Sequence, residues 1–153
     1  MKKILLLLFL IPNLVTSEEE FVPVTEYTAN NPNWQSNIYE ILYVAYRCGY
    51  AYSSAHHKLV EHIGDDGVKV DLYIKGLRIA MTAVEHVENT YGDISLYDFN
   101  SITFTVRAID EFYYEQAKMN YKGNSQFDGI IGNDLKSCEG YDTFFESLVI
   151  RDV

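Results

Sequence analysis

The longest regular pattern in the chain is residues 33–63, which read NWQSNIYEILYVAYRCGYAYSSAHHKLVEHI. Its apolar residues recur mostly at spacings of three and four, which places them on one face of a helix with 3.6 residues per turn. They are Ile38, Leu42, Ala45, Gly49, Tyr52, Leu59 and Ile63. Gly64 follows directly, and glycine favours the left-handed conformation in which many helices end. This stretch therefore predicts one long helix.

Three further helical patterns of similar length follow, and each has residues that favour a helix start or stop. Asp66 and Gly92 bound the second, and its apolar stripe is Val70, Ile74, Leu77, Met81, Val84 and Tyr91. Ser95 opens the third, which ends at Gly123, and Ser125 opens the fourth. An aspartate lies three residues after each serine, as in a capping box. The apolar stripe of the third helix is Phe99, Ile102, Val106, Ile109 and Tyr113. The stripe of the fourth is Phe127, Ile131, Cys138, Tyr141, Phe145 and Val149.

Short connections between helices of similar length favour antiparallel neighbours. We therefore expect an all-α domain over residues 33–153, an antiparallel up-down-up-down four-helix bundle with few or no strand residues. Residues 18–32 contain Pro23 and Pro32 and show no helical period. They predict an extended N-terminal arm before the bundle.

Residues 1–17 have the composition of a cleavable secretory signal peptide. Lys2 and Lys3 precede an apolar run over residues 4–11, and the small residues Val15 and Ser17 precede the expected cut. A membrane anchor needs roughly 18 or more apolar residues, and this run is shorter. We expect an exported protein, periplasmic or secreted, that is not held in a membrane after cleavage.

The chain is acidic, with 22 Asp and Glu against 12 Lys and Arg and a formal net charge of −10. Cleavage after residue 17 would remove two lysines and make the charge about −12. Nucleic-acid binding needs a positive face that displaces counterions, so a nucleic-acid partner is not expected. A basic protein partner stays open beside the simpler interpretation that the charge serves solubility.

Two cysteines, Cys48 and Cys138, are present. In an oxidising compartment an even cysteine count favours a disulfide, and both residues fall on the core side of their predicted helices. We expect them to form a bridge. The competing interpretation is two buried free thiols.

A second stripe on the first helix consists of Tyr39, Tyr43, Tyr46 and Tyr50, continued by His57. It lies about 120° from the centre of the aliphatic stripe, taking 100° per residue. Tyrosine is favoured at binding surfaces because it combines a stiff ring with a polar tip. The stripe therefore marks a candidate surface for a protein partner or self-association. The competing interpretation is ordinary packing against other helices or the arm.

Polar residues inside the core stripes suggest an alternative site. Asp134 lies one turn before Cys138, and His56 lies between Tyr52 and Leu59. A buried carboxylate needs a partner, because burying it unpaired costs several kcal/mol. A polar pocket near Tyr52, His56 and Asp134 would suit a small-molecule binder or an enzyme; a satisfied core hydrogen bond is the structural alternative.

No catalytic motif is present: the sequence has no GxSxG, HExxH, phosphate loop or glycine-rich dinucleotide turn. His56, His57 and His62 cluster in sequence but diverge around a straight helix, so neither a metal site nor a cofactor is expected. We expect a non-enzymatic binding or accessory protein, with the pocket as the alternative.

Overall fold

The computed structural model describes residues 21–64, 71–92 and 99–149, and the described chain is predominantly helical. Five α-helices are α1 (Val24–Asn30), α2 (Ile38–Ile63), α3 (Asp71–Tyr91), α4 (Phe99–Asn120) and α5 (Gly129–Val149). A 3-10 turn, η1 (Trp34–Ser36), precedes α2, and two short strands, β1 (Tyr121–Gly123) and β2 (Gln126–Phe127), join α4 to α5. The prediction of an all-α chain is thus confirmed at the level of fold class.

Helix α2 begins later than residue 33 because Asn37 caps it. The Asn37 side chain accepts hydrogen bonds from the backbone N–H groups of Tyr39 and Glu40, which satisfies donors that the first turn leaves free. Gly64, with φ of 78°, ends the helix as its sequence position predicts. The expected signal peptide, the Asp66 cap and the Ser95 capping box lie outside the described residues.

The expectation of an extended arm over residues 18–32 is wrong where the structure describes it, because residues 24–30 form α1. Val24 and Thr28, four residues apart, are buried on the face that packs against α5. The Thr28 hydroxyl shares a 2.7 Å hydrogen bond with the Tyr141 hydroxyl. A helix of two turns is marginal alone and depends on such tertiary contacts, which a short sequence pattern does not reveal.

The expected capping box at Ser125 is also wrong. Asn124 and Ser125 both have positive φ, 50° and 60°, as in the tight turns that join antiparallel strands. The turn pairs Tyr121 with Phe127 and Gly123 with Gln126. Ser125 therefore lies in a hairpin turn, and α5 begins at Gly129.

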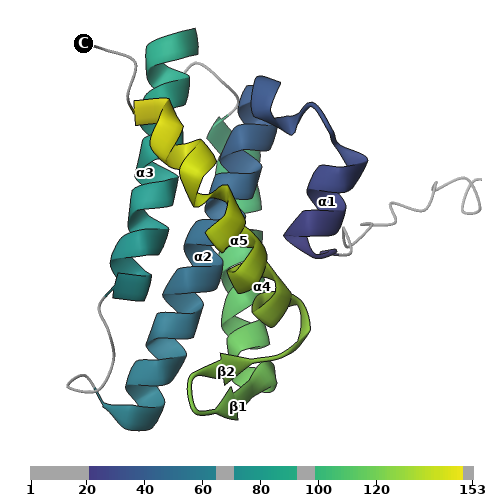
Figure 1. Cartoon of the computed structure of the whole chain (residues 1–153). Coiled ribbons are helices and arrows are strands. Elements are labelled where there is room, and N and C mark those ends of the chain that lie inside the picture. The colour runs from purple at the N-terminus through teal and green to yellow at the C-terminus, as the bar shows by residue number, and fades with distance from the viewer. Residues whose placement is uncertain (1–20, 65–70, 93–98, 150–153) are drawn as a thin grey trace, which may run out of the picture.

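Helix α2 is the central element, since it packs against α3, α4 and α5 (Figure 1). Its closest approach is to α3, where two glycines face each other. A Cβ built on Gly76 would lie 2.6 Å from the Gly49 carbonyl oxygen, closer than any side chain tolerates. The pairing of these glycines brings the two backbones into direct contact.

Candidate functional site

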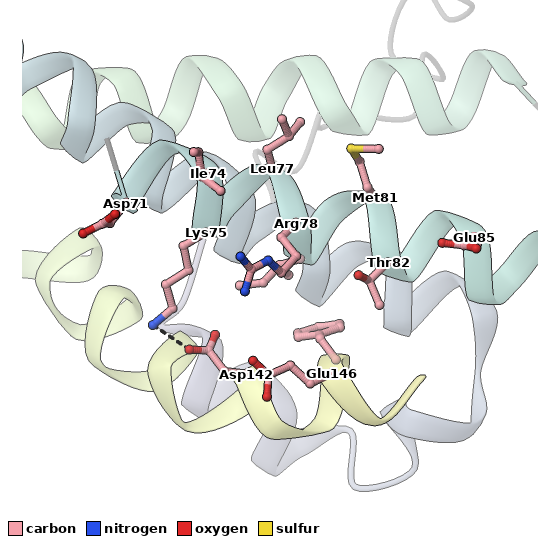
Figure 2. A pocket seen from close by; sticks show the side chains of 12 residues that line it. Asp71, Ile74, Lys75, Leu77, Arg78, Met81, Thr82, Glu85, Asp142 and Glu146 are labelled. Atoms are coloured by element: carbon pink, nitrogen blue, oxygen red, sulfur yellow. Dashed lines mark ion pairs between the residues drawn. The ribbon is translucent and has the colours of Figure 1, made fainter. Parts of the chain in front are cut away.

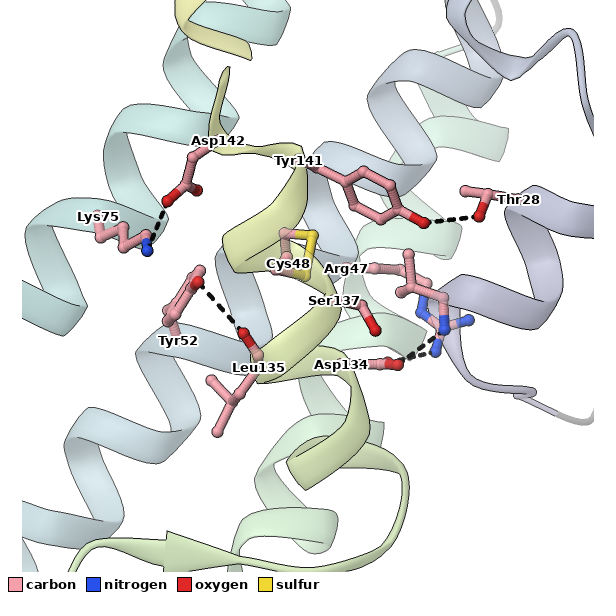
Figure 3. The surroundings of a disulfide bond; sticks show 12 residues. Thr28, Arg47, Cys48, Tyr52, Lys75, Asp134, Leu135, Ser137, Tyr141 and Asp142 are labelled. Carbon is pink, nitrogen blue, oxygen red and sulfur yellow. Dashed lines mark hydrogen bonds and ion pairs between the residues drawn. A yellow bond between two sulfur atoms is a disulfide. The ribbon is translucent and has the colours of Figure 1, made fainter. Parts of the chain in front are cut away.

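Cys48 and Cys138 form the expected disulfide between α2 and α5, with Cα atoms 5.5 Å apart (Figure 3). A separation of this size is typical of a disulfide. The bridge fixes which faces of α2 and α5 meet. It thereby sets the surroundings of the polar residues that lie near it, among them Arg47, Tyr52 and Asp134.

Asp134 lies at the centre of a fully buried polar network. It accepts hydrogen bonds from the Val24 backbone N–H at 2.7 Å, from Arg47 Nη2 at 2.8 Å and from the Tyr113 hydroxyl. Arg47 Nε also donates to the Tyr113 hydroxyl at 2.9 Å. The side chains of Arg47 and Asp134 are both 0% exposed. Three donors on one carboxylate satisfy the requirement of a buried charge.

The electrostatics of this network keep Arg47 charged. Burial acts to lower the pKa of Arg47, but the fields of Tyr113, Asp134 and Tyr43 outweigh it and raise that pKa. Burial raises the pKa of Tyr113 well above its ordinary value. Tyr113 therefore stays a neutral hydrogen-bond donor. The network links α1, α2, α4 and α5, and none of its described groups is open to a substrate.

The other members of the predicted core pocket lie elsewhere. The Tyr52 hydroxyl donates to the Leu135 carbonyl at 3.4 Å, and Figure 3 shows Tyr52 and Asp134 on opposite sides of α5. The His56 ring lies beside the rings of His57 and Tyr73. Asp134 is instead joined to Arg47, a residue that the sequence pattern did not single out.

The tyrosine stripe is divided by its packing. Tyr39 is 53% exposed; Tyr43, Tyr46 and Tyr50 are half-buried. The Tyr43 ring lies 4.5 Å from the Tyr27 ring of α1. These rings do not form one continuous exposed patch, and His57 is exposed near its end. Of this stripe, Tyr46 and Tyr50 border a cleft between α2 and α3.

Helix α3 shows the largest departure from the sequence pattern. Ile74, Leu77 and Met81, expected in the core, are 47%, 48% and 62% exposed. Between residues 71 and 90 of α3, the buried residues are Gly76, Ile79, Thr82, Ala83 and Val87. Contact with Gly49 requires small residues at the interface, so α3 turns its larger apolar side chains outward. They form a ridge that consists of Ile74, Leu77 and Met81.

A cleft of about 880 Å³ lies between this ridge and α5. Phe145 and Ile79 contribute apolar walls, and Lys75 forms a 2.5 Å ion pair with Asp142 across it. Figure 2 shows the Arg78 side chain on the α5 side of α3, and Ile74, Leu77 and Met81 on another side. Among the described residues Arg78 has no ion-pair partner. The carboxylates that also line this cleft are Asp71, Glu85 and Glu146.

A second cleft, of about 230 Å³, lies on the other flank of the ridge, between α2 and α3. Its lining includes Tyr46, Tyr50 and Ser53 of α2 and Tyr73, Leu77 and Ala80 of α3. Burial raises the pKa of Tyr46, and Glu88 adds to the shift. Burial likewise raises the pKa of Tyr50, and Asp110 of α4 adds to it. Negative charge therefore acts on both tyrosines.

Within the described residues, no group of three or more His, Cys, Asp or Glu side chains is placed to hold a metal ion. None of the helices described is long and apolar enough to cross a bilayer. Comparison of the chain with protein-family models, with curated proteins and with solved structures gives no match.

Proposed function

We propose that this chain is an exported, non-enzymatic binding protein, and that the α3 ridge with its two flanking clefts binds a basic amphipathic helix of a partner protein. The observation that carries the proposal is the outward row of Ile74, Leu77 and Met81. Their spacing of three and four places them on one face of α3, where they present a row of apolar side chains to a partner. Apolar residues gathered beside a cleft mark interaction sites more often than residues scattered singly do.

Charge supports a basic occupant. The α3–α5 cleft is lined by three carboxylates, Asp71, Glu85 and Glu146, beside the Lys75–Asp142 ion pair. Arg78 is the other cation in its lining, so negative charge is in excess. The whole chain carries a net charge of −10. Complementary charge speeds association and excludes acidic competitors. An apolar helical face with lysine or arginine at its edges would complement both the ridge and its rim.

Export is proposed on two grounds. The basic and apolar composition of residues 1–17 is that of a cleavable signal peptide, and the Cys48–Cys138 bridge suits an oxidising compartment. Mass spectrometry of protein recovered from the periplasm or the medium tests this. A mature chain that begins near Glu18 is expected, and an intact Met1 would contradict it.

We also propose that α2 to α5 constitute an antiparallel up-down-up-down four-helix bundle. The packing of α2 on α3, α4 and α5 supports this arrangement, as does the packing of α5 on α3 and α4. Distances between spin labels at the helix ends would test the helix directions.

The binding proposal is tested with defined peptides. An 18-residue helical peptide with a leucine face and lysine edges is compared with the same peptide carrying glutamate edges, by fluorescence anisotropy. The lysine peptide should bind at least about tenfold more tightly, a difference of about 1.4 kcal/mol. Equal affinities of the lysine and glutamate peptides would contradict the proposal of a basic partner helix.

A matched pair of variants locates the site. Met81→Glu and Met119→Glu each place a carboxylate at an exposed methionine, 62% and 66% exposed. Met81→Glu should weaken binding of the lysine peptide, because it interrupts the apolar row. Met119→Glu on α4 should leave that binding unchanged. Equal effects of the two variants would contradict the ridge as the site. If the natural chain forms a dimer and Met81→Glu makes it monomeric, the ridge binds a second copy of this chain. That result would overturn the proposal of a basic partner.

A further inference from the structure

The α2–α3 cleft has the features of a site for a cation. Gly49 and Gly76 bring the two helix backbones together at its base. Three tyrosines, Tyr46, Tyr50 and Tyr73, line it. Aromatic faces around a small cleft attract a cation through the negative potential above each ring.

The charges around this cleft favour the same class of ligand. Glu88 and Asp110 act on Tyr46 and Tyr50, respectively. The two cations on α3 are directed elsewhere: Lys75 lies 5.0 Å from the Tyr52 ring and pairs with Asp142, and Arg78 lines the α3–α5 cleft (Figure 2). The cleft between α2 and α3 is therefore lined by three tyrosines and by no lysine or arginine.

The chain uses the same interaction internally. The Arg47 guanidinium carbon lies 5.4 to 5.7 Å from the ring centres of Phe21, Tyr43 and Tyr113. Lys118 Nζ lies 5.0 Å from the Tyr114 ring. A flat guanidinium stacks on aromatic rings, which matches the tyrosine walls of this cleft.

We propose that the α2–α3 cleft binds the guanidinium group of an arginine side chain. This inference rests on the proposed function, since the arginine would come from the basic partner helix whose apolar face lies on the ridge. Leu77 belongs to both the ridge and the cleft lining, so a helix seated on the ridge has its near edge at this cleft. The cleft would then select arginine at one edge position of the partner.

The probe is N-acetyl-arginine amide, and its control is N-acetyl-citrulline amide, which has the same shape with a neutral urea group. Both are titrated at fixed ionic strength into the full mature chain, and the ring signals of Tyr46, Tyr50 and Tyr73 are followed by NMR. The arginine derivative should give saturable shifts and bind about fivefold more tightly than citrulline, which corresponds to about 1 kcal/mol. Equal binding, or shifts confined to other tyrosines, would overturn the proposal.

Variants separate the ring from the charge. Tyr50→Phe keeps the aromatic face and should keep binding within about twofold, whereas Tyr50→Leu should abolish the preference over citrulline. Asp110→Asn should weaken arginine binding about two- to threefold, and Glu111→Gln, one residue along α4, should not. If Tyr50→Leu fails to fold, the comparison of Asp110→Asn with Glu111→Gln decides, and equal effects of these two would contradict the site.

The two proposals can fail separately. If the lysine-edged peptide binds and Met81→Glu weakens it, the ridge stands whatever the arginine derivative does. If the derivative shifts the three tyrosines but no peptide binds, the cleft stands as an arginine site without the ridge. If the arginine derivative binds no more tightly than the citrulline derivative, the arginine site is contradicted and the ridge proposal is unaffected.

Discussion

Arg47 and Asp134 are charges that the fold has taken wholly out of water. A buried ion pair is costly to form and more costly to break, because the remaining partner is left uncompensated. Asp134→Ala should therefore lower the free energy of unfolding by about 3 to 5 kcal/mol, measured by urea denaturation. An effect below about 1 kcal/mol would contradict a buried, fully paired carboxylate.

The exposed pair of Arg107 and Glu111 is the matched control, with a 3.0 Å separation and side chains 79% and 67% exposed. Solvent screens such a pair, so Glu111→Ala should change stability by less than about 0.5 kcal/mol. A comparable loss in both variants would mean that charge deletion itself, and not burial, sets the cost.

Tyr113 makes stability fall at alkaline pH. Burial raises the pKa of Tyr113 well above its ordinary value of 10.0, so the native state keeps a phenol proton that the unfolded chain loses. Stability is therefore lost as pH rises from about 10 toward the native pKa, by up to about 1.4 kcal/mol per pH unit. Tyr113→Phe should reduce this slope when unfolding is measured between about pH 9 and pH 11. An unchanged slope would assign the effect to other tyrosines.

The sequence marked Asp134 as a core carboxylate but not its partner. Its position one turn before Cys138 placed it on the buried face, and a buried carboxylate required a partner. Arg47 immediately precedes Cys48, but the expected antiparallel helices joined at the cysteines bring Asp134 level with Tyr52, so the disulfide register did not point to Arg47. The Val24 N–H donor could not be identified in this way either, because the position of α1 depends on packing across 110 residues of sequence.

The α2–α3 contact sets the position of the ridge, and its glycines can be tested directly. Gly76→Ala would place a Cβ 2.6 Å from the Gly49 carbonyl oxygen. The helices would have to move apart, which should cost about 1 to 3 kcal/mol. Gly140→Ala in α5 meets nothing within 4 Å and should be neutral or stabilise by up to about 1 kcal/mol. The difference between their thermal unfolding midpoints is the measurement, and equal midpoints would contradict the close contact.

Helix periodicity predicted a helix between Asp66 and Gly92 but wrongly placed Ile74, Leu77 and Met81 in the core. A stripe of Ile74, Leu77 and Met81 is the more hydrophobic face, and sequence reasoning chooses that face by default. Gly76, Ile79 and Ala83 are buried instead, because one tight glycine contact outweighs side-chain size. The candidate site was missed for this reason: its residues had been counted as core.

The disulfide constrains the molecule as a whole. Its cysteines are 90 residues apart, and a loop of that length removes about 4 to 5 kcal/mol of conformational freedom from the unfolded chain. The Cys48→Ala/Cys138→Ala double variant should lose about 2 to 5 kcal/mol in urea unfolding. A reducing agent should destabilise the natural chain similarly and leave the variant unchanged. A variant as stable as the oxidised chain would contradict this.

The same bridge closes a covalent ring that contains the whole of α3, α4 and the β1–β2 hairpin. A protease that cuts once anywhere between residues 48 and 138 opens the ring but releases no fragment. Both halves stay joined through Cys48 and Cys138, with α3 tethered to the body at one end. On a non-reducing gel the nicked protein would remain one species, and a thiol would divide it in two. A protein with this connectivity keeps its proposed ridge attached after a cut that would sever an open chain.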